Sequence, residues 1–156
     1  HAPYSGDEEA GVVVKPTRWD RQILTQPQTP VARVDVSSEQ AGYGSSNIID
    51  GNDFSWWIAG DDSFPQTVTL TLPQTTFITA SRIRFQKDSS AYRHRVETSE
   101  DGQTWQLLYE RECTGWDFKP IRIGKSIRYL RLTIDKASEG RAGLAEITLF
   151  QKTNNT

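Results

Sequence analysis

An oxygen-rich stretch built around a glycine is the part of this sequence best suited to chemistry. It covers residues 47–57 and reads NIIDGNDFSWW. Glycine lets the backbone reverse without a Cβ clash, so the side chains of Asp50, Asn52 and Ser55 can converge on one point. Calcium accepts about six to eight oxygen ligands, including carboxylate and carbonyl oxygens. The stretch therefore fits either a calcium-binding loop or a plain Asp-Gly turn between two strands.

Residue types suited to catalysis are few. Only two histidines occur, and one is the terminal His1, which leaves little capacity for a general base near neutral pH. The sequence contains no nucleophile elbow, phosphate-binding loop or zinc-ligand spacing. Asp61 and Asp62 are adjacent, so their carboxylates should point apart rather than toward a common substrate. We therefore predict that the domain is not an enzyme.

The length and charge of the chain predict a single domain that does not bind nucleic acid or an anionic membrane. The chain has 156 residues, a formal net charge of -2 and a pI near 5.7. These values allow one hydrophobic core and argue against nucleic acid or an anionic membrane as a partner. The start at His1 does not resemble a signal peptide, so we expect a piece whose targeting segment has been removed. The single cysteine, Cys113, excludes an internal disulfide and suits a buried or half-buried apolar role.

Short runs of alternating apolar and polar residues predict an all-β domain. The runs cover residues 68–72, 82–85, 96–98, 105–109, 121–123, 130–134 and 147–149. The turn at residues 99–103 joins two of these runs as a predicted hairpin. The one helical signal is a single turn over residues 45–49, with Ser45 or Ser46 as its cap. Strands of this length and spacing are typical of a β-sandwich or barrel.

The first thirty residues differ in composition from the rest. Residues 7–9 are acidic and residues 26–30 are rich in Gln and Pro. We predict that residues 1–30 form a linker or the edge of a preceding module, with one edge strand at residues 12–14. Residues 31–152 are predicted to form the β-domain, and residues 153–156 a tail.

Four segments along the chain carry a family resemblance. They are NIIDGN at residues 47–52 followed by Ser55 and Trp57, VETSEDGQTW at 96–105, IRYLRL at 127–132, and LAEI at 144–147. In this order they resemble the discoidin family, also called the coagulation factor 5/8 type C domain, whose bacterial members form carbohydrate-binding module family 32. The resemblance covers residues 31–150. It implies a jelly-roll β-sandwich with binding loops at one end.

The resemblance also implies a structural calcium ion between the Asp-Gly loop and the last strand. The implied ligands are the side chains of Asp50, Asn52 and Glu146, the hydroxyl and carbonyl of Ser55, and the carbonyls of Asn47 and Ala145. This oxygen set suits Ca²⁺ better than zinc or Mg²⁺. The ion would hold loops in place and take no part in a reaction.

A sugar site needs an aromatic platform and a few planar hydrogen-bonding groups. The aromatic candidates in predicted loops are Tyr43, Trp56, Tyr92 and Trp116, whereas Trp57 and Trp105 are expected in the core. The polar candidates are Lys87, Asp88, His94, Glu139 and Arg141. Trp116 is the preferred platform and Tyr43 the second.

Each of these candidates has a simpler alternative. A loop aromatic can merely cover the rim of the sandwich. His94 can be a hydrogen-bonded structural residue, and the charged side chains can form surface ion pairs worth under ~1 kcal/mol. The residues therefore outline a region for a site without identifying its sugar.

Together these features predict a non-catalytic carbohydrate-binding module. We expect it to be a monomeric part of a larger secreted bacterial glycoside hydrolase, outside the cytoplasm, that tethers the enzyme to glycans of the galactose or N-acetylhexosamine type. The lack of a cysteine pair supports this branch of the family, because eukaryotic members usually join their termini by a disulfide. The alternative is a discoidin-type domain for adhesion to proteins or membranes, for which exposed Trp116 is the one candidate apolar spike.

Overall fold

The structure, a computed structural model, describes residues 17–152. The edge strand predicted at residues 12–14 lies outside the described residues. The elements are α1 (Arg18–Leu24), β1 (Arg33–Val36), the 3₁₀ helix η2 (Ser45–Ile49), β2 (Trp57–Ile58), β3 (Gln66–Phe85), β4 (Ala91–Ser99), β5 (Gln106–Thr114), β6 (Ile121–Ala137) and β7 (Gly143–Phe150).

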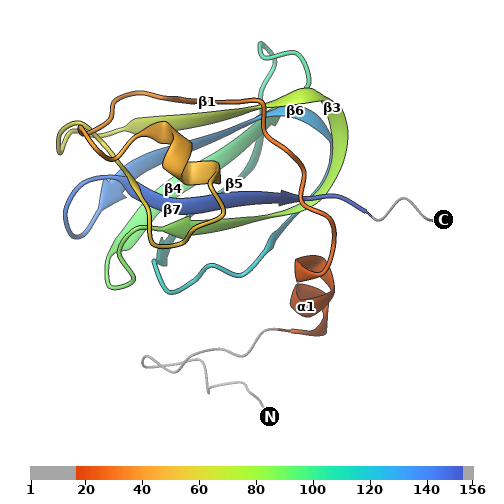
Figure 1. Cartoon of the computed structure of the whole chain (residues 1–156), viewed down its shortest axis with the longest axis horizontal. Coiled ribbons are helices and arrows are strands. Elements are labelled where there is room, and N and C mark those ends of the chain that lie inside the picture. Colours follow the sequence, from red (N-terminus) through yellow and green to blue (C-terminus); the bar gives the residue numbers. More distant parts are fainter. Residues whose placement is uncertain (1–16, 153–156) are drawn as a thin grey trace.

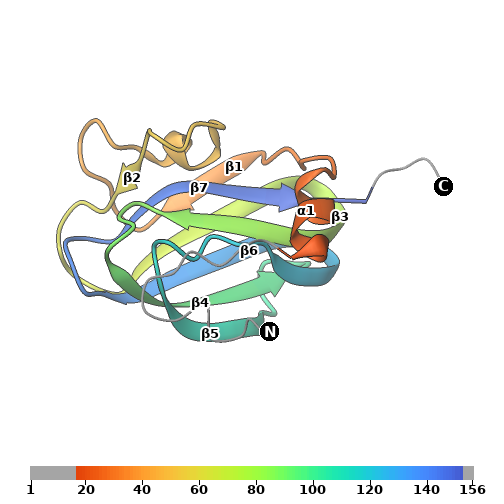
Figure 2. The same cartoon turned by 90° about the horizontal axis from the view of Figure 1, so that it is seen from below.

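Two long strands, β3 and β6, build the two layers of a sandwich (Figures 1 and 2). The first part of β3 pairs with β1 and with the second part of β6, which also pairs with β4. The second part of β3 pairs with β7 and with the start of β6. The β3–β6 register breaks between Thr71 and Thr76, and strands that pass from one sheet to another turn the corner at such irregularities. The predicted all-β sandwich is therefore confirmed.

Alternating apolar residues on both layers form one core. On β3, Val68, Leu70 and Leu72 are buried, whereas the threonines between them are half-buried. Leu132 on β6 and Leu144 on β7 join the same buried cluster. Complete burial of one such side chain stabilises the fold by about 1.5–3 kcal/mol relative to exposure. The alternation of apolar and polar residues in the sequence therefore corresponds to the alternation of buried and less buried side chains along the strand.

Most predicted strands are present, but several merge. The runs at 68–72 and 82–85 are both parts of β3, and those at 121–123 and 130–134 are both parts of β6. The hairpin through residues 99–103 is confirmed, because β4 and β5 pair antiparallel on either side of it. The predicted helical turn is η2. Its N-cap is Gly44, without a side-chain cap bond, so the predicted serine cap is wrong.

A short helix, α1, lies in the segment predicted to be a linker. Asp20 N donates to Thr17 Oγ1 at 3.0 Å and Thr17 N donates to Asp20 Oδ2 at 2.8 Å, which forms a capping box. Ile23 packs in a buried cluster with Ala80 and Phe150. The helix has seven residues, too few for a clear 3.6-residue periodicity, although the Thr-x-x-Asp pattern marks its start.

Several connecting loops lie at one end of the sandwich, at the left in Figure 1, whereas the β4–β5 turn projects at the top and α1 lies toward the other end. Within this loop end, Gly115 N donates to Ser90 O at 2.9 Å. A Cβ atom on Gly115 would lie 2.0 Å from the carbonyl oxygen of Lys87. Two loops, 86–90 and 114–118, therefore approach so closely that only glycine fits at this contact.

We expect Gly115→Ala to destabilise the domain by about 1–3 kcal/mol, because a backbone segment must move to admit the methyl group. Denaturant unfolding of the variant and the parent measures this difference. Gly44→Ala is the matched control: its Cβ would meet the flexible side chain of Glu39 at 3.3 Å, so it should cost at most about 1 kcal/mol. Equal stability of the two variants would contradict a tight contact between the loops.

Candidate functional site

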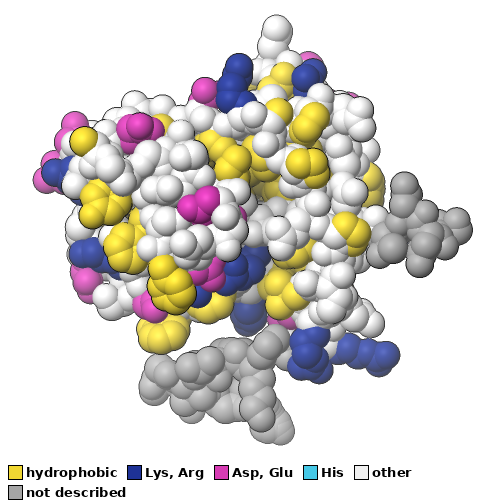
Figure 3. Space-filling model, viewed as in Figure 1, with side chains coloured by type: hydrophobic (Ala, Val, Ile, Leu, Met, Phe, Trp, Pro, Cys, Tyr) yellow, Lys and Arg dark blue, Asp and Glu magenta, His cyan; other side chains and the backbone are white. Residues whose placement is uncertain are grey.

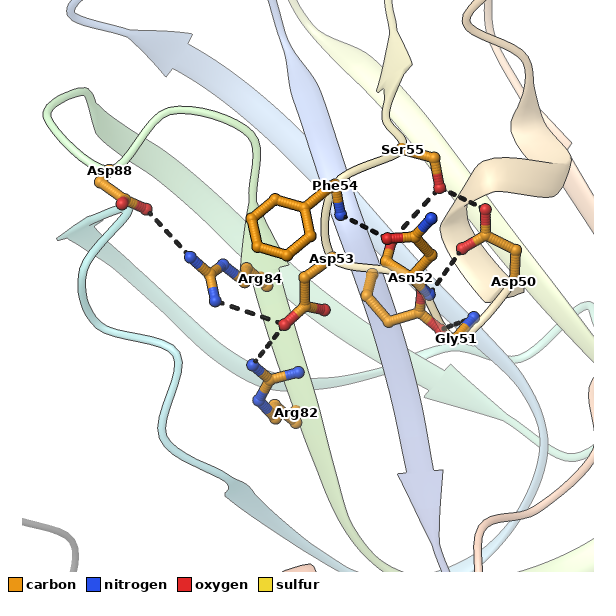
Figure 4. Close-up of polar contacts among 10 residues, drawn as sticks. Asp50, Gly51, Asn52, Asp53, Phe54, Ser55, Arg82, Arg84 and Asp88 are labelled. Carbon is orange, nitrogen blue, oxygen red and sulfur yellow. Dashed lines mark hydrogen bonds and ion pairs between the residues drawn. The ribbon is translucent and has the colours of Figure 1, made fainter.

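The Asp-Gly loop, residues 50–56, holds its oxygen atoms close together by a series of internal hydrogen bonds (Figure 4). Gly51 has a φ of 74°, a left-handed conformation that favours glycine. Asn52 N donates to Asp50 Oδ1 at 2.9 Å, and the Ser55 hydroxyl donates to the other carboxylate oxygen of Asp50. Phe54 N donates to the side-chain oxygen of Asn52 at 2.9 Å. The loop is therefore held in one conformation, with the side chains of Asp50, Asn52 and Ser55 close together.

Glu146, on β7, closes this loop from the opposite side. It is only 6% exposed, and its Oε2 accepts a hydrogen bond from Gly51 N at 3.1 Å. Its other carboxylate oxygen, Oε1, is buried and has no hydrogen-bond partner among the described residues. Burial and, to a smaller extent, the carboxylates of Asp50 and Asp53 raise the pKa of Glu146 to about 7, although the Gly51 hydrogen bond acts in the opposite direction.

A cation would satisfy this arrangement. A buried carboxylate oxygen without a partner is costly, and a bound ion removes that cost. Within residues 17–152, no three His, Cys, Asp or Glu side chains lie close enough to hold a metal by themselves. Any ligands beyond the carboxylates would have to be amide, hydroxyl or backbone oxygens, which calcium accepts.

Ala145 and Asn47, implied as ligands only through their backbone, lie in a strand bulge and beside the Asp-Gly loop, respectively. The pairing of β3 with β7 passes from Phe85–Leu144 to Arg84–Glu146, so Ala145 is an extra residue in the ladder. A bulge of this kind leaves the extra residue outside the regular pairing. The side-chain amide of Asn47 donates to Trp56 O at 2.9 Å and so supports the end of the loop. The resemblance implies the backbone carbonyl of Asn47 as a calcium ligand, and the hydrogen bond to Trp56 does not involve this carbonyl because it is made by the side chain.

An ion-pair cluster extends outward from the same loop (Figure 4). Asp53 Oδ2 accepts from Arg82 Nη2 at 3.2 Å and from Arg84 Nη1 at 3.3 Å. Both guanidinium groups lie over the ring of Phe118, at 5.0 Å and 4.4 Å from its centroid. Arg84 also pairs with Asp88 at 3.6 Å. The cluster thus connects the Asp-Gly loop to loop 86–90, which carries candidate sugar-binding residues.

Sequence reasoning missed this cluster. Arg82 and Arg84 alternate with Ile83, which indicates that both arginines point to the same outer face. Nothing in the local sequence identifies Asp53 as their partner, because it lies 29 residues before Arg82. Only the tertiary fold brings the three together.

Two of the candidate sugar contacts are buried, which removes them from the site. Tyr92 has no exposed surface; its ring stacks on Phe85 at 4.4 Å and its hydroxyl accepts from Lys87 N at 3.1 Å. His94 is also buried, with Nδ1 3.1 Å from Tyr92 O and Nε2 2.9 Å from the Tyr109 hydroxyl. Burial lowers the pKa of His94. Both side chains point inward because alternate residues of β4 face the core.

Other candidates lie on adjoining loops, which we call the rim: residues 86–90, 114–118 and 138–141. Trp116 is 61% exposed. Ser89 Oγ donates to Glu139 Oε1 at 3.1 Å, and a Cβ on Gly140 would lie 3.1 Å from Lys87 Nζ, so loops 86–90 and 138–141 are in contact. The rim therefore brings Trp116, Lys87, Asp88 and Glu139 onto neighbouring loops.

The remaining candidates have structural contacts of their own. Arg141 Nη1 donates to the Gln40 side chain at 3.1 Å, to Gly60 O at 3.2 Å and to Ala59 O at 3.3 Å. Tyr43 is half-buried, and its backbone N donates to Gln40 O at 2.9 Å. Arg141, at the end of rim loop 138–141, and Tyr43 therefore both contact Gln40, whereas half-buried Trp56 ends the Asp-Gly loop.

The two tryptophans expected in the core differ in burial. Trp57 is fully buried, and its indole N–H donates to Ser38 O at 2.9 Å. Trp105 is half-buried under the guanidinium of Arg131, 4.0 Å from its ring centroid, so it covers the sheet instead of filling the core. Cys113 is half-buried as expected, and burial raises the pKa of its thiol to about 11.

The surface offers no broad field of one charge on the face in Figure 3, where basic and acidic side chains are interspersed. Among residues 17–152, no helix has the length and apolar character to cross a bilayer.

Comparison with known proteins places this architecture in a family. The sequence profile of the F5/8 type C domain matches residues 33–147. A pectin-binding carbohydrate-binding module superposes with a TM-score of 0.68 and 21% identity, over 81% of this chain and 94% of that one. The CBM32 of AlyQ, solved with 4,5-unsaturated mannuronic acid, has a TM-score of 0.68 and 19% identity, over 80% and 98% of the two chains.

A third similar structure is the family 32 module from NanJ of Clostridium perfringens, solved with galactose. It has a TM-score of 0.68 and 17% identity, over 80% of this chain and all of that one (100%). No curated protein matches the chain. The likeness to these structures shows a shared fold, and the profile match covers most of the sequence. The chain therefore belongs to the F5/8 type C domain family.

Proposed function

We propose that this domain is a non-catalytic carbohydrate-binding module. The observation that carries the proposal is the exposed ring of Trp116, on one of three packed rim loops that also carry Lys87, Asp88 and Glu139. Similar folds bind pectin, mannuronic acid or galactose, which supports a saccharide ligand here. The module would tether a larger secreted bacterial enzyme to its glycan, outside the cytoplasm.

The rim supplies the groups that a neutral sugar requires. One apolar face of a pyranose can stack on the Trp116 indole, while its hydroxyls meet donors and acceptors. Lys87 can donate, and Asp88 and Glu139 can accept. Because the loops are already packed together, binding loses little conformational entropy. We propose galactose or an N-acetylhexosamine as the ligand class.

Tethering explains how a single weak sugar site can still hold an enzyme on its glycan. A monomeric module with one weak site gains from linkage to a second binding domain, because the second contact then forms at a high effective concentration. The rim site can therefore function with a low affinity, provided that it distinguishes its glycan from others.

We also propose that a calcium ion binds between the Asp-Gly loop and Glu146. Support comes from the buried, unpartnered Oε1 of Glu146 and from the oxygen atoms of Asp50, Asn52 and Ser55 on the facing loop. The carbonyls of Asn47, Ser55 and Ala145 would complete the ligand set. The ion would neutralise the acidic loop and fix its position against β7.

Trp116→Ala should weaken binding to galactose or N-acetylhexosamine glycans by about tenfold or more, because it removes the stacking surface. Isothermal titration with galactose, N-acetylgalactosamine, N-acetylglucosamine and fucose measures the effect. Phe77→Ala is the matched control, since Phe77 is also an exposed ring (48%) but lies on β3 outside the rim. Binding to anionic liposomes with no glycan binding would support the adhesive alternative and reject this function.

Calcium should raise the melting temperature, and EDTA should lower it. At a calcium concentration one hundred times the dissociation constant, binding adds about 2.7 kcal/mol to the free energy of unfolding. For a domain of this size the melting temperature then rises by roughly 5–10 °C. Glu146→Gln keeps the shape of the side chain but removes its charge, so its melting temperature should not respond to calcium. An EDTA-insensitive parent would contradict the calcium site.

Calcium affinity should also depend on pH, because Glu146 must lose its proton to bind the ion. With a pKa of about 7, the apparent affinity should fall by about tenfold between pH 8 and pH 6. In EDTA the free energy of unfolding should fall as pH rises from 4.5 to about 7, since only the folded state still holds the proton in this range. Titrations of parent and Glu146→Gln at several pH values test both effects, and a parent with no pH dependence would argue against a buried carboxylate ligand.

A further inference from the structure

A hollow of about 390 Å³ lies beside the Asp-Gly loop, on the outer face of β3 and β7. Arg82 and Thr148 are cross-strand neighbours in its floor. Phe54 and Asn52 line it from the loop, and Gln28 from the segment after α1. Its volume lies in the range of small-molecule sites, at about 300–1,000 Å³. Trp116 and the rim loops do not line this hollow.

Phe54 gives the hollow an exposed aromatic wall. The residue is 82% exposed, more than any other large hydrophobic residue among those described. Its backbone N donates to Asn52, and the rest of the loop is tied to Asp50 and Glu146. A ring on such a restrained loop can stack on a ligand at a small entropic cost.

The polar lining can exchange hydrogen bonds with hydroxyl groups. The guanidinium of Arg82 has five N–H donors, and its ion pair with Asp53 uses one. The side-chain amides of Asn52 and Gln28 and the hydroxyl of Thr148 add donors and acceptors. An aromatic ring with several planar polar groups is the combination that binds a pyranose.

The charges in the hollow favour a neutral ligand. Asp53 and Glu146 line it together with Arg82, so an anionic ligand would meet two carboxyl groups and one guanidinium. Arg84, the other cation nearby, is already shared by Asp53 and Asp88. A calcium ion at Glu146 would offset part of this negative charge but would itself be surrounded by oxygen ligands.

We propose that this hollow is a second saccharide subsite, which binds a neutral pyranose unit against Phe54. The inference rests on the proposed carbohydrate-binding function and extends it from a single sugar to an oligosaccharide. The Asp53–Arg84–Asp88 contacts lead from the hollow to the rim loop 86–90 (Figure 4). We expect a glycan chain bound in this subsite to extend from the hollow toward loop 86–90.

Nitrogen-15 NMR titrations of the full chain can test the subsite. The probes are galactose, galactotetraose, N-acetylglucosamine and chitotetraose, with tetragalacturonate as the anionic comparison. We expect a neutral tetrasaccharide to shift the backbone amides of Asn52, Phe54 and Thr148. Phe54→Ala should abolish these shifts, keep those at Gly115 and Trp116, and weaken tetrasaccharide affinity by about fivefold to tenfold. Leu107→Ala, at another exposed apolar residue, should change neither set.

The outcomes separate this subsite from the rim site. Shifts at the rim but none around Phe54 would overturn the second subsite and leave the carbohydrate-binding function intact. Shifts around Phe54 with tetragalacturonate alone would overturn the neutral ligand class. No shift in either region with any probe would reject both the subsite and the proposed function.

Discussion

The contact between Glu146 and Gly51 organises the candidate site. It joins residues 95 positions apart and fastens the Asp-Gly loop to the last strand of the sandwich. A buried carboxylate is costly unless it is protonated, hydrogen-bonded or bound to a cation. Here one oxygen has the backbone N–H of Gly51 and the other has no partner among the described residues, while the carboxylates of Asp50 and Asp53 increase the negative charge nearby. The fold therefore keeps a buried carboxylate at the place where the Asp-Gly loop meets β7, and its contact with Gly51 fixes the loop there.

From this contact, a series of polar and packing interactions reaches the rim. Asp53 pairs with Arg84, and Arg84 pairs with Asp88 in loop 86–90. That loop in turn meets Gly115 with no room for a side chain. Each ion pair is partly exposed and worth little alone, but the contacts share residues and limit one another's motion. The result is a set of loops whose conformation is largely settled before a ligand arrives, which suits recognition without catalysis.

The sequence predicted the layers of the fold better than the site. Alternation at 68–72 and 130–134 identified core strands because burial itself has a period of two. It did not show that β3 continues through the exposed corner near residues 73–75, where the apolar pattern stops. Tyr92 and His94 could have been assigned to the core by extending the alternation of Val96 backward along β4. The Asp53 cluster has no such local signal, because Asp53 lies 29 and 31 residues before its two arginine partners.

Residues 47–57 contribute both to the closed loop and to the ion pairs of β3, because neighbouring side chains in a tight loop point in different directions. Asp50, Asn52 and Ser55 form the hydrogen bonds that close the loop, and Gly51 donates to Glu146, whereas Asp53 reaches the arginines of β3. Phe54, between these polar groups, has no place in the core and stays in solvent. An exposed ring is unfavourable in water, yet here it stands on a restrained loop above donors and acceptors. The hydrogen bonds that hold the loop against β7 thus also restrain the segment that carries this aromatic ring, and a single folded segment can support both stability and recognition.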